Sequence, residues 1–131
     1  MSLRNLKVFG LIPARGGSRG IKNKNMLLVN DRPLIDYTID AALNSKYIDE
    51  VYLSSDSNII LDHSRKRNIS IVERPKEYAK DDSTAVDVVS HFYSFLKNKN
   101  IISYKEDFFL CYLQPTSPLR TTAILDASFL E

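Results

Sequence analysis

Short apolar runs alternate with segments of helical periodicity along this chain, and this alternation narrows the fold more than any other feature. Residues 8–12 form a continuous apolar run closed by Pro13, which is typical of a strand buried on both faces. Further strands are expected at 51–53, 70–72 and 108–113, and helices at 35–43, 57–67 and 85–96. This order predicts an α/β fold in three layers, a mostly parallel sheet with helices on both faces.

Polar residues beside the apolar stripes indicate where helices begin. The stripe over 85–96 is the best helical pattern, and Asp82 or Ser83 is its expected N-cap. A last helix is expected to start near Thr121 or Thr122. We expect residues 1–131 to form a single domain, since 44% hydrophobic and 26% charged residues are average for a soluble globular domain.

Cysteine and histidine usage argues against disulfides and zinc. Cys111 is the single cysteine and lies in an apolar strand, where a small buried side chain is expected. His63 and His91 give no zinc-ligand spacing, and we expect both to be solvated and not catalytic. No apolar run approaches the roughly 18 residues of a membrane span, and the chain starts without a signal-peptide pattern. A reducing, cytoplasmic location without a membrane partner is therefore expected.

Positive charge is concentrated at the start of the chain. Residues 1–30 hold six Lys and Arg and no Asp or Glu, whereas the other residues hold 12 Lys and Arg against 16 acids. This asymmetry indicates a local anionic ligand. Nucleic acid is the competing partner, but Gly, Pro and an apolar strand interrupt the charges and no aromatic residues interleave with them, so no nucleic-acid partner is expected.

The loop after the first strand has the composition of a triphosphate-binding loop. Residues 15–25 contain three glycines and four basic side chains, which allow close backbone approach and charge pairing with phosphate oxygens. The glycines at 16, 17 and 20 match neither a Walker A loop nor the GxGxxG pattern. Ligands of open parallel sheets bind beyond the carboxyl ends of the strands, where the strand order reverses. The alternative is a surface loop without a ligand.

Three later loops are expected at the same edge of the sheet. Residues 54–57 offer hydroxyls and the Asp56 carboxylate, although Asp56 or Ser57 could instead cap the following helix. Arg74 follows the third strand and is expected at the same rim as Arg15, with a solvated surface arginine as the alternative. Gln114 follows the fourth strand beside two prolines, and its amide suits a base or sugar edge, with a plain turn as the alternative.

Four segments of this chain resemble the motifs of one enzyme family. They read LIPARGGSRGIKNKN at 11–25, IDEVYLSSDS at 48–57, ERPKEYAKDDS at 73–83 and YLQPTSPLR at 112–120. In this order they are similar to the motifs of acylneuraminate cytidylyltransferases, which activate sialic acids and related nonulosonic acids as CMP-sugars. The resemblance implies a Rossmann-like fold of the nucleotide-diphospho-sugar transferase type. It also implies that the acid's anomeric hydroxyl attacks the α-phosphate of CTP and releases pyrophosphate, with magnesium assisting.

The resemblance assigns roles to particular positions. Arg15 and Lys24 match the positions that stabilise charge on the transferring phosphoryl group, so both are candidate catalytic residues. The candidate nucleotide-binding residues lie in the first loop and in two later motifs: Arg15, Ser18, Arg19, Lys24, Asn25, Arg74, Ser83 and Gln114. Gln114 is expected near the cytidine.

Three features depart from the family pattern. Ala85 stands where members usually carry Ser or Thr, and Lys22 replaces a frequent Pro. The family is also longer, and its second half supplies the sugar pocket, a dimer-forming segment and the paired aspartates that hold magnesium. We therefore expect a chain truncated relative to the family, without magnesium ligands and without the pocket that selects the acceptor acid. The alternatives are a non-catalytic CTP-binding module and an inactive fragment. A homodimer is compatible with the sheet edge that such a chain exposes.

Overall fold

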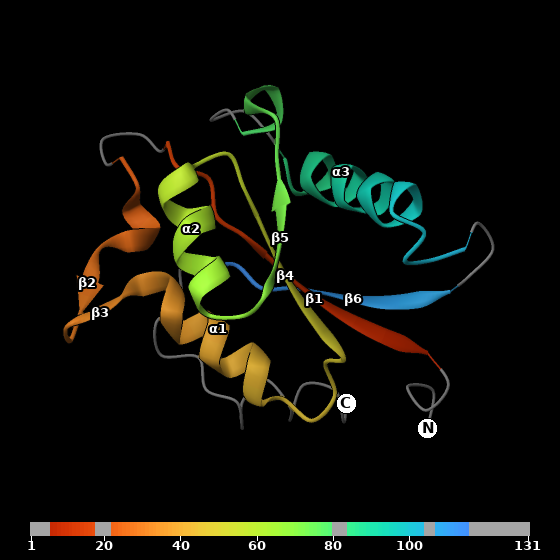
Figure 1. Ribbon diagram of the computed structural model, residues 1–131, viewed down its shortest axis with the longest axis horizontal. Coiled ribbons are helices and arrows are strands. Elements are labelled where there is room, and N and C mark those ends of the chain that lie inside the picture. The colour runs from red at the N-terminus through yellow and green to blue at the C-terminus, as the bar shows by residue number, and fades with distance from the viewer. Residues whose placement is uncertain (1–5, 18–21, 80–83, 104–106, 116–131) are drawn as a thin grey trace.

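Four parallel strands form the centre of the protein. The computed structural model describes residues 6–17, 22–79, 84–103 and 107–115. The strands are β1 (Lys7–Pro13), β4 (Glu50–Ser55), β5 (Ser70–Glu73) and β6 (Phe108–Tyr112), and their order is β5-β4-β1-β6. Helix α3 (Ala85–Asn98) covers one face of this sheet, and α1 (Leu34–Asn44) and α2 (Asn58–Lys66) cover the other (Figure 1). The expected three-layer α/β fold is confirmed.

Two apolar layers hold the helices against the sheet. Side chains alternate along each strand, so that Leu53 packs toward α1 and α2 and Tyr52 packs toward α3. On the α3 side, the Phe9 ring makes edge-to-face contacts with Tyr52, Phe92 and Phe108 at centroid distances of 5.8, 6.2 and 5.3 Å. Each such contact adds roughly 0.5–1.5 kcal/mol beyond its area burial. Strand β1 is therefore fixed from both faces, as its continuous apolar run predicts.

The order of the strands reverses at β1. The chain proceeds from β1 to β4 and β5 on one side, and then returns to pair β6 with the other side of β1. Where the connections that follow two neighbouring parallel strands run toward opposite edges of the sheet, a crevice forms beyond the carboxyl ends of those two strands. The loop after β1 and the segment after β6 both begin at this crevice.

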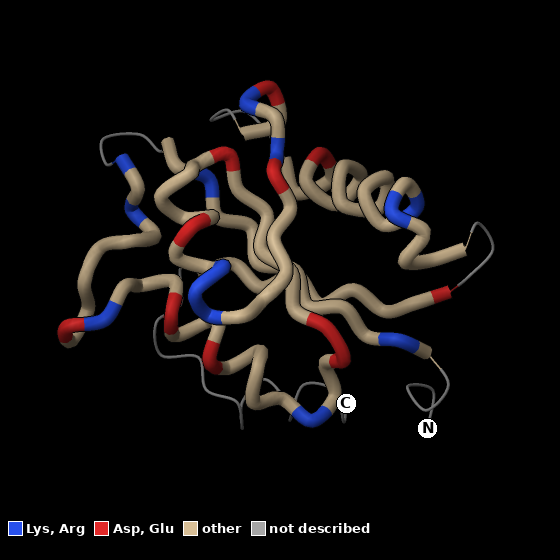
Figure 2. Tube along the Cα trace, viewed as in Figure 1, with Lys and Arg blue, Asp and Glu red and all other residues tan. Residues whose placement is uncertain are grey.

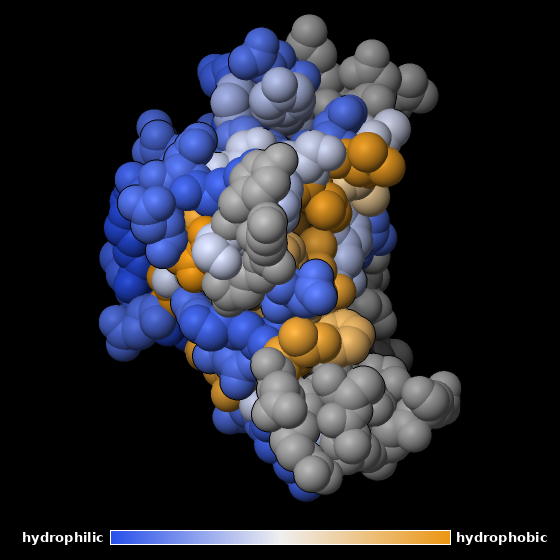
Figure 3. All heavy atoms as spheres, turned by 90° about the vertical axis from the view of Figure 1, so that its right-hand side faces the viewer, coloured by the Kyte–Doolittle hydropathy of each residue, from blue (hydrophilic) through white to orange (hydrophobic). Residues whose placement is uncertain are grey.

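Strand β6 forms one edge of the sheet. Among the described residues it pairs only with β1. Its Phe109 side chain is 38% exposed, and hydrophobic atoms reach the surface on the side of the molecule where β6 starts (Figure 3). Cys111 is half-buried against the apolar layer under α1 and α2, and so is less enclosed than the sequence predicts.

The N-terminus of α3 differs from the sequence-based expectation. Its N-cap is Thr84, so the expectation of Asp82 or Ser83 is wrong. The Thr84 hydroxyl accepts a hydrogen bond from the Asp87 N–H at 3.2 Å, and the Asp87 carboxylate accepts one from the Thr84 N–H at 3.0 Å. This reciprocal capping box needs an acidic or amide side chain three residues after the cap, and only Thr84 of the three candidates has one.

A short antiparallel hairpin separates the first loop from α1. Strand β2 (Leu28–Val29) pairs with β3 (Arg32–Pro33). Between them, Asn30 and Asp31 have φ angles of 52° and 64°, and two successive left-handed residues are typical of a type I′ turn. The sequence does not predict these strands, because two-residue strands show no alternation.

Two 3-10 helices lie where the sequence predicts loops. They are η1 (Lys24–Met26) and η2 (Lys76–Tyr78). The helix expected near Thr121 or Thr122 lies outside the described residues. None of the helices that the structure describes is long and apolar enough to cross a membrane.

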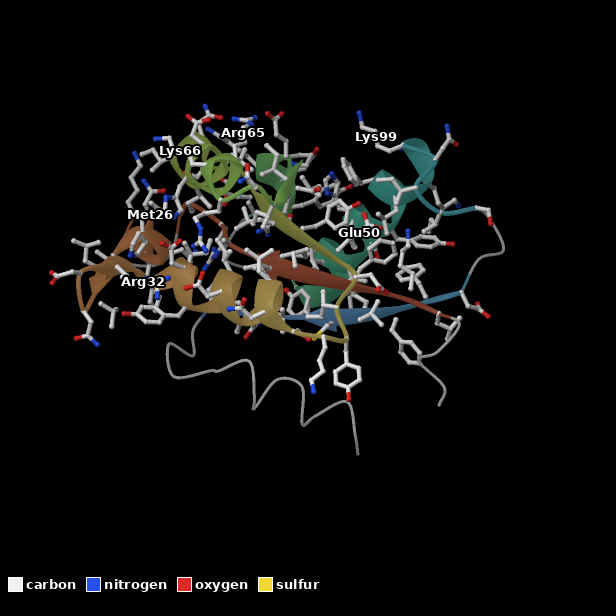
Figure 4. All side chains as sticks on the ribbon, turned by 60° about the horizontal axis from the view of Figure 1, so that its bottom comes forward. Met26, Arg32, Glu50, Arg65, Lys66 and Lys99 are labelled. Carbon is white, nitrogen blue, oxygen red and sulfur yellow. The ribbon has the colours of Figure 1, made fainter. Side chains whose placement is uncertain are left out.

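A network of charges joins the hairpin, α1 and α2. Asp40 pairs with Arg32 and Arg67, and Arg32 lies beside α1 (Figure 4). Burial raises the pKa of Asp40, but hydrogen bonds from Arg67 and Arg32 outweigh burial and hold that pKa below its usual range. Asp36 lies 2.6 Å from His63 Nε2 and 3.1 Å from Arg67 Nη1. The expectation of a solvated His63 is therefore wrong, because its partner carboxylate lies on the neighbouring helix.

Candidate functional site

The loop after β1 folds back on itself just beyond the strand. The Asn23 N–H donates a hydrogen bond to the Gly16 carbonyl at 2.5 Å, which joins the start of the loop to its end. The Asn25 side-chain amide donates to the Arg15 carbonyl at 3.2 Å. Asn23 has a φ angle of 54°, a left-handed conformation that Asn tolerates better than most residues. These bonds hold Arg15 close to η1, whose first residue is Lys24.

The same loop is attached to the junction between β4 and α2. The Asp56 carboxylate accepts a hydrogen bond from the Gly16 N–H at 2.8 Å, and the Ser57 hydroxyl donates to Asn23 Oδ1 at 3.0 Å. A Cβ atom at Gly16 would lie 2.6 Å from the Ser57 Cβ, so this approach requires glycine. Of the two possible caps of α2, Ser57 is the N-cap, because its hydroxyl accepts the Ile60 N–H. Asp56 is thereby left to hold the loop.

Arg74 is buried at the same edge of the sheet, and only 5% of it is exposed. Its guanidinium donates to the Tyr78 carbonyl at 3.0 Å and to the Ser54 carbonyl at 3.2 Å. Its Nε has no hydrogen-bond partner among the described residues. Burial lowers the pKa of Arg74, and the charge of Asp56 opposes that decrease while the charge of Arg15 adds to it. The alternative of a solvated surface arginine is therefore excluded for Arg74. A desolvated cation with an N–H that has no partner is suited to an oxygen ligand.

A polar cluster continues from Arg74 toward α3. The His91 ring lies against the Tyr78 ring with centroids 5.7 Å apart, and its buried Nδ1 has no hydrogen-bond partner in the described part of the chain. Burial, and then the charge of Arg74, lowers the pKa of His91, so the imidazole is neutral at pH 7. Burial raises the pKa of Tyr112, against the charge of Arg74 and a hydrogen bond from the Gln114 side chain. The expectation of a solvated His91 is wrong, because η2 covers it.

The structure brings together five of the residues that the sequence singles out. They follow the carboxyl ends of β1, β5 and β6, and they are Arg15, Lys24, Asn25, Arg74 and Gln114. Basic residues lie along the segment that follows residues 18–21 (Figure 2). Ser18, Arg19 and Ser83 lie outside the described residues. Ala85 and Lys22 are both exposed, and Ala85 is the first residue of α3.

Sequence reasoning missed three members of this arrangement. Asn23 closes the loop through its backbone N–H. The Tyr78 carbonyl accepts a hydrogen bond from Arg74, and Tyr112 interacts electrostatically with Arg74. An asparagine between two lysines in a glycine-rich loop is a signal for a left-handed position, and it could have pointed to Asn23. No sequence signal points to the two tyrosines.

The residues present do not form a metal site in the described ranges. No group of three or more His, Cys, Asp or Glu side chains there could hold a metal ion. The magnesium that the resemblance implies has no ligand set among them, so no reaction step is assigned to it.

The strand order and the placement of the glycine-rich loop define a Rossmann-like α/β fold. Solved structures share it at identities that show the fold alone. A CMP:2-keto-3-deoxy-manno-octonic acid synthetase complexed with CTP matches with a TM-score of 0.71 and 17% identity, over 95% of this chain and 46% of that one. A cytidylyltransferase from Leptospira borgpetersenii matches with a TM-score of 0.67 and 22% identity, over 97% and 49%.

The chain belongs to the cytidylyltransferase family, whose model matches residues 9–127. It is 38% identical to an N-acylneuraminate cytidylyltransferase from Escherichia coli O18:K1:H7, over 92% of this chain and 27% of that protein. It is 36% identical to a pseudaminic acid cytidylyltransferase from Campylobacter jejuni, over 95% of this chain and 52% of that protein. The resemblance to acylneuraminate cytidylyltransferases is thereby confirmed, and the chain spans between a quarter and about half of these relatives.

Proposed function

We propose that this chain binds CTP and acts in the transfer of CMP to a nonulosonic acid, with release of pyrophosphate. The main support is the closed loop between Arg15 and Lys24, which places two cations beyond β1 where the strand order reverses. Membership of the cytidylyltransferase family supports the reaction type. The names of the two relatives, which concern N-acylneuraminate and pseudaminic acid, support an acceptor of the sialic type.

In this proposal, the residues of the chain contribute to the reaction by stabilising charge and by positioning the triphosphate. The Arg15 guanidinium and the Lys24 ammonium bind the triphosphate and stabilise the negative charge that develops as the acceptor oxygen attacks the α-phosphate. Asn25 holds the Arg15 backbone, and Ser18 and Arg19 are proposed as further triphosphate-binding residues. Magnesium would neutralise further phosphate charge, with ligands that the described residues do not supply.

The nucleoside is proposed to bind toward β6 and α3. Gln114 follows β6, is exposed, and carries both a donor and an acceptor that can read the edge of a cytosine. Arg74 has a buried Nε without a partner among the described residues, and Ser83 precedes the cap of α3 in the sequence. A preference for CTP over UTP is expected, because the exchange of an amino group for a carbonyl leaves polar groups of the site unpaired.

Calorimetry with CTP tests the binding step, with and without magnesium. Arg15→Ala is expected to weaken binding by about tenfold or more, which is ~1.4 kcal/mol. Arg65→Ala is the matched control, since Arg65 pairs with Asp62 on the outer surface of α2 (Figure 4). Equal affinity of wild type and Arg15→Ala, or no CTP binding by the folded wild type, would contradict the proposal.

Pyrophosphate release with CTP and a nonulosonic acid tests the transfer step. CTP binding without release is the result expected of a non-catalytic CTP-binding module.

A homodimer is a further proposal, and light scattering of the chain at two concentrations tests it.

A further inference from the structure

Asp56 occupies an unusual place for a carboxylate. It lies at the end of β4, and it accepts the Gly16 N–H at 2.8 Å from the loop that carries Arg15. Its negative charge also acts on the buried Arg74 guanidinium. An anionic side chain at a site for an anionic ligand repels that ligand. Its presence there therefore requires a compensating role.

The start of the loop has little freedom to move away from this carboxylate. Gly16 approaches Ser57 so closely that a Cβ atom would lie 2.6 Å from the Ser57 Cβ. Its carbonyl accepts the Asn23 N–H, and Asn23 in turn accepts the Ser57 hydroxyl at 3.0 Å. Among the described residues, two hydrogen bonds thus attach the loop to the β4–α2 junction, one from its first glycine to Asp56 and one from Ser57 to its end.

We propose that Asp56 is a positioning residue for the nucleotide, which acts by holding the Gly16 N–H and so fixing the loop that presents Arg15 and Lys24. This inference rests on the proposed function of the loop. The hydrogen bond favours CTP binding because it prearranges the loop, whereas the charge opposes CTP binding by repulsion. In the absence of CTP the charge has a separate effect, because it compensates the buried Arg74 cation.

The two effects separate in a pair of variants. Asp56→Asn keeps an oxygen that can accept the Gly16 N–H and removes the charge, and Asp56→Ala removes both. We expect Asp56→Asn to bind CTP at least as tightly as wild type while its melting temperature falls. We expect Asp56→Ala to bind CTP about tenfold more weakly, because the loss of a hydrogen bond to a charged group outweighs the removal of the repulsion. A purely structural role would move affinity and melting temperature together in both variants.

Asp62→Ala is the matched control, because it removes an aspartate that is 64% exposed on α2 and pairs only with Arg65 among the described residues. Asn23→Gly is a second variant, in case Asp56→Ala does not fold. It removes the side chain that accepts the Ser57 hydroxyl, and glycine adopts a φ of 54° without strain. Weaker CTP binding is expected for Asn23→Gly and unchanged binding for Asp62→Ala.

The experiment combines calorimetry with CTP and hydrogen exchange of the Gly16 amide without CTP. Asp56→Ala is expected to speed exchange of that amide, and Asp56→Asn to leave it protected. CTP affinity in Asp56→Ala equal to that of Asp62→Ala would overturn the inference, as would equal weakening in Asp56→Asn and Asp56→Ala. Failure of the proposed function has a different signature, namely no CTP binding by wild type together with a Gly16 amide that only Asp56→Ala exposes.

Discussion

The first loop packs closely against the start of α2 at Gly16 but not at Gly17. We therefore expect Gly16→Ala to lower the free energy of unfolding and Gly17→Ala not to lower it. Gly16→Ala places a Cβ 2.6 Å from the Ser57 Cβ, whereas carbon atoms pack at about 3.5–4.0 Å. Rotation of the Ser57 side chain cannot relieve the clash, because rotation does not move a Cβ atom. The backbone at Gly16 must therefore shift by roughly 1 Å.

Such a shift breaks the hydrogen bond between Gly16 and Asp56. The bond measures 2.8 Å, and 1 Å more takes it out of hydrogen-bonding range. The loss of a hydrogen bond to a charged group costs about 1.5–3 kcal/mol. If the backbone does not shift, the overpacking remains instead and costs a similar amount, about 1–3 kcal/mol. We therefore expect Gly16→Ala to lower the free energy of unfolding by about 1.5–3 kcal/mol, or the melting temperature by roughly 5–10 °C.

Gly17→Ala is the control, because nothing lies within 4 Å of a Cβ at Gly17. It is expected to leave the free energy of unfolding unchanged or to raise it by up to about 1 kcal/mol, since alanine restricts the unfolded chain. Urea denaturation followed by far-UV circular dichroism measures both variants, as the chain has no tryptophan. If Gly16→Ala unfolds at the same urea concentration as Gly17→Ala, the argument from close approach is wrong.

Three further substitutions test other parts of the fold. Thr84→Ala removes one bond of the capping box, so a loss of about 1 kcal/mol is expected in urea denaturation, and no loss would contradict the cap. Asp40 has a lowered pKa, so its stabilisation is present above pH ~3.9 and is lost as the pH falls through its folded-state pKa. Asp40→Asn should flatten that acid limb of the stability profile, and an unchanged limb would contradict the ion pairs. The lowered pKa of His91 means that the unfolded chain takes up this proton first below pH ~6.5, which destabilises the fold. His91→Phe should remove that loss, and an identical slope from pH 7 to 5 in both proteins would show that His91 is solvated.

The sequence predicts the strands well where both faces are apolar. The run at 8–12 lies inside β1, whose central residues are all buried. The run at 51–53 is too short, because β4 continues through Ser54 and Ser55, both of them fully buried and polar. In the sequence, polar residues indicate the end of an apolar run. At the carboxyl end of a parallel strand, however, polar residues can still belong to the strand, because ligands bind at that edge of the sheet.

Contacts between elements explain the remaining differences. His63 meets Asp36 from the neighbouring helix, 27 residues earlier, and Asp56 meets Gly16 across 40 residues. Periodicity indicates which side of a helix faces the sheet, but it does not indicate which polar groups face each other across two helices. The edge of the sheet where Arg15, Arg74 and Gln114 lie is predictable, because topology alone sets it.

The position of β1 in the middle of the sheet also bears on how the protein folds during synthesis. Lys7 of β1 pairs with Phe108 of β6, about 100 residues later, and translation adds roughly 5–20 residues per second. Strand β1 therefore leaves the ribosome roughly 5–20 s before β6. During that time one backbone edge of an apolar strand has no partner in its own chain, which makes the nascent protein open to strand exchange and aggregation until β6 emerges.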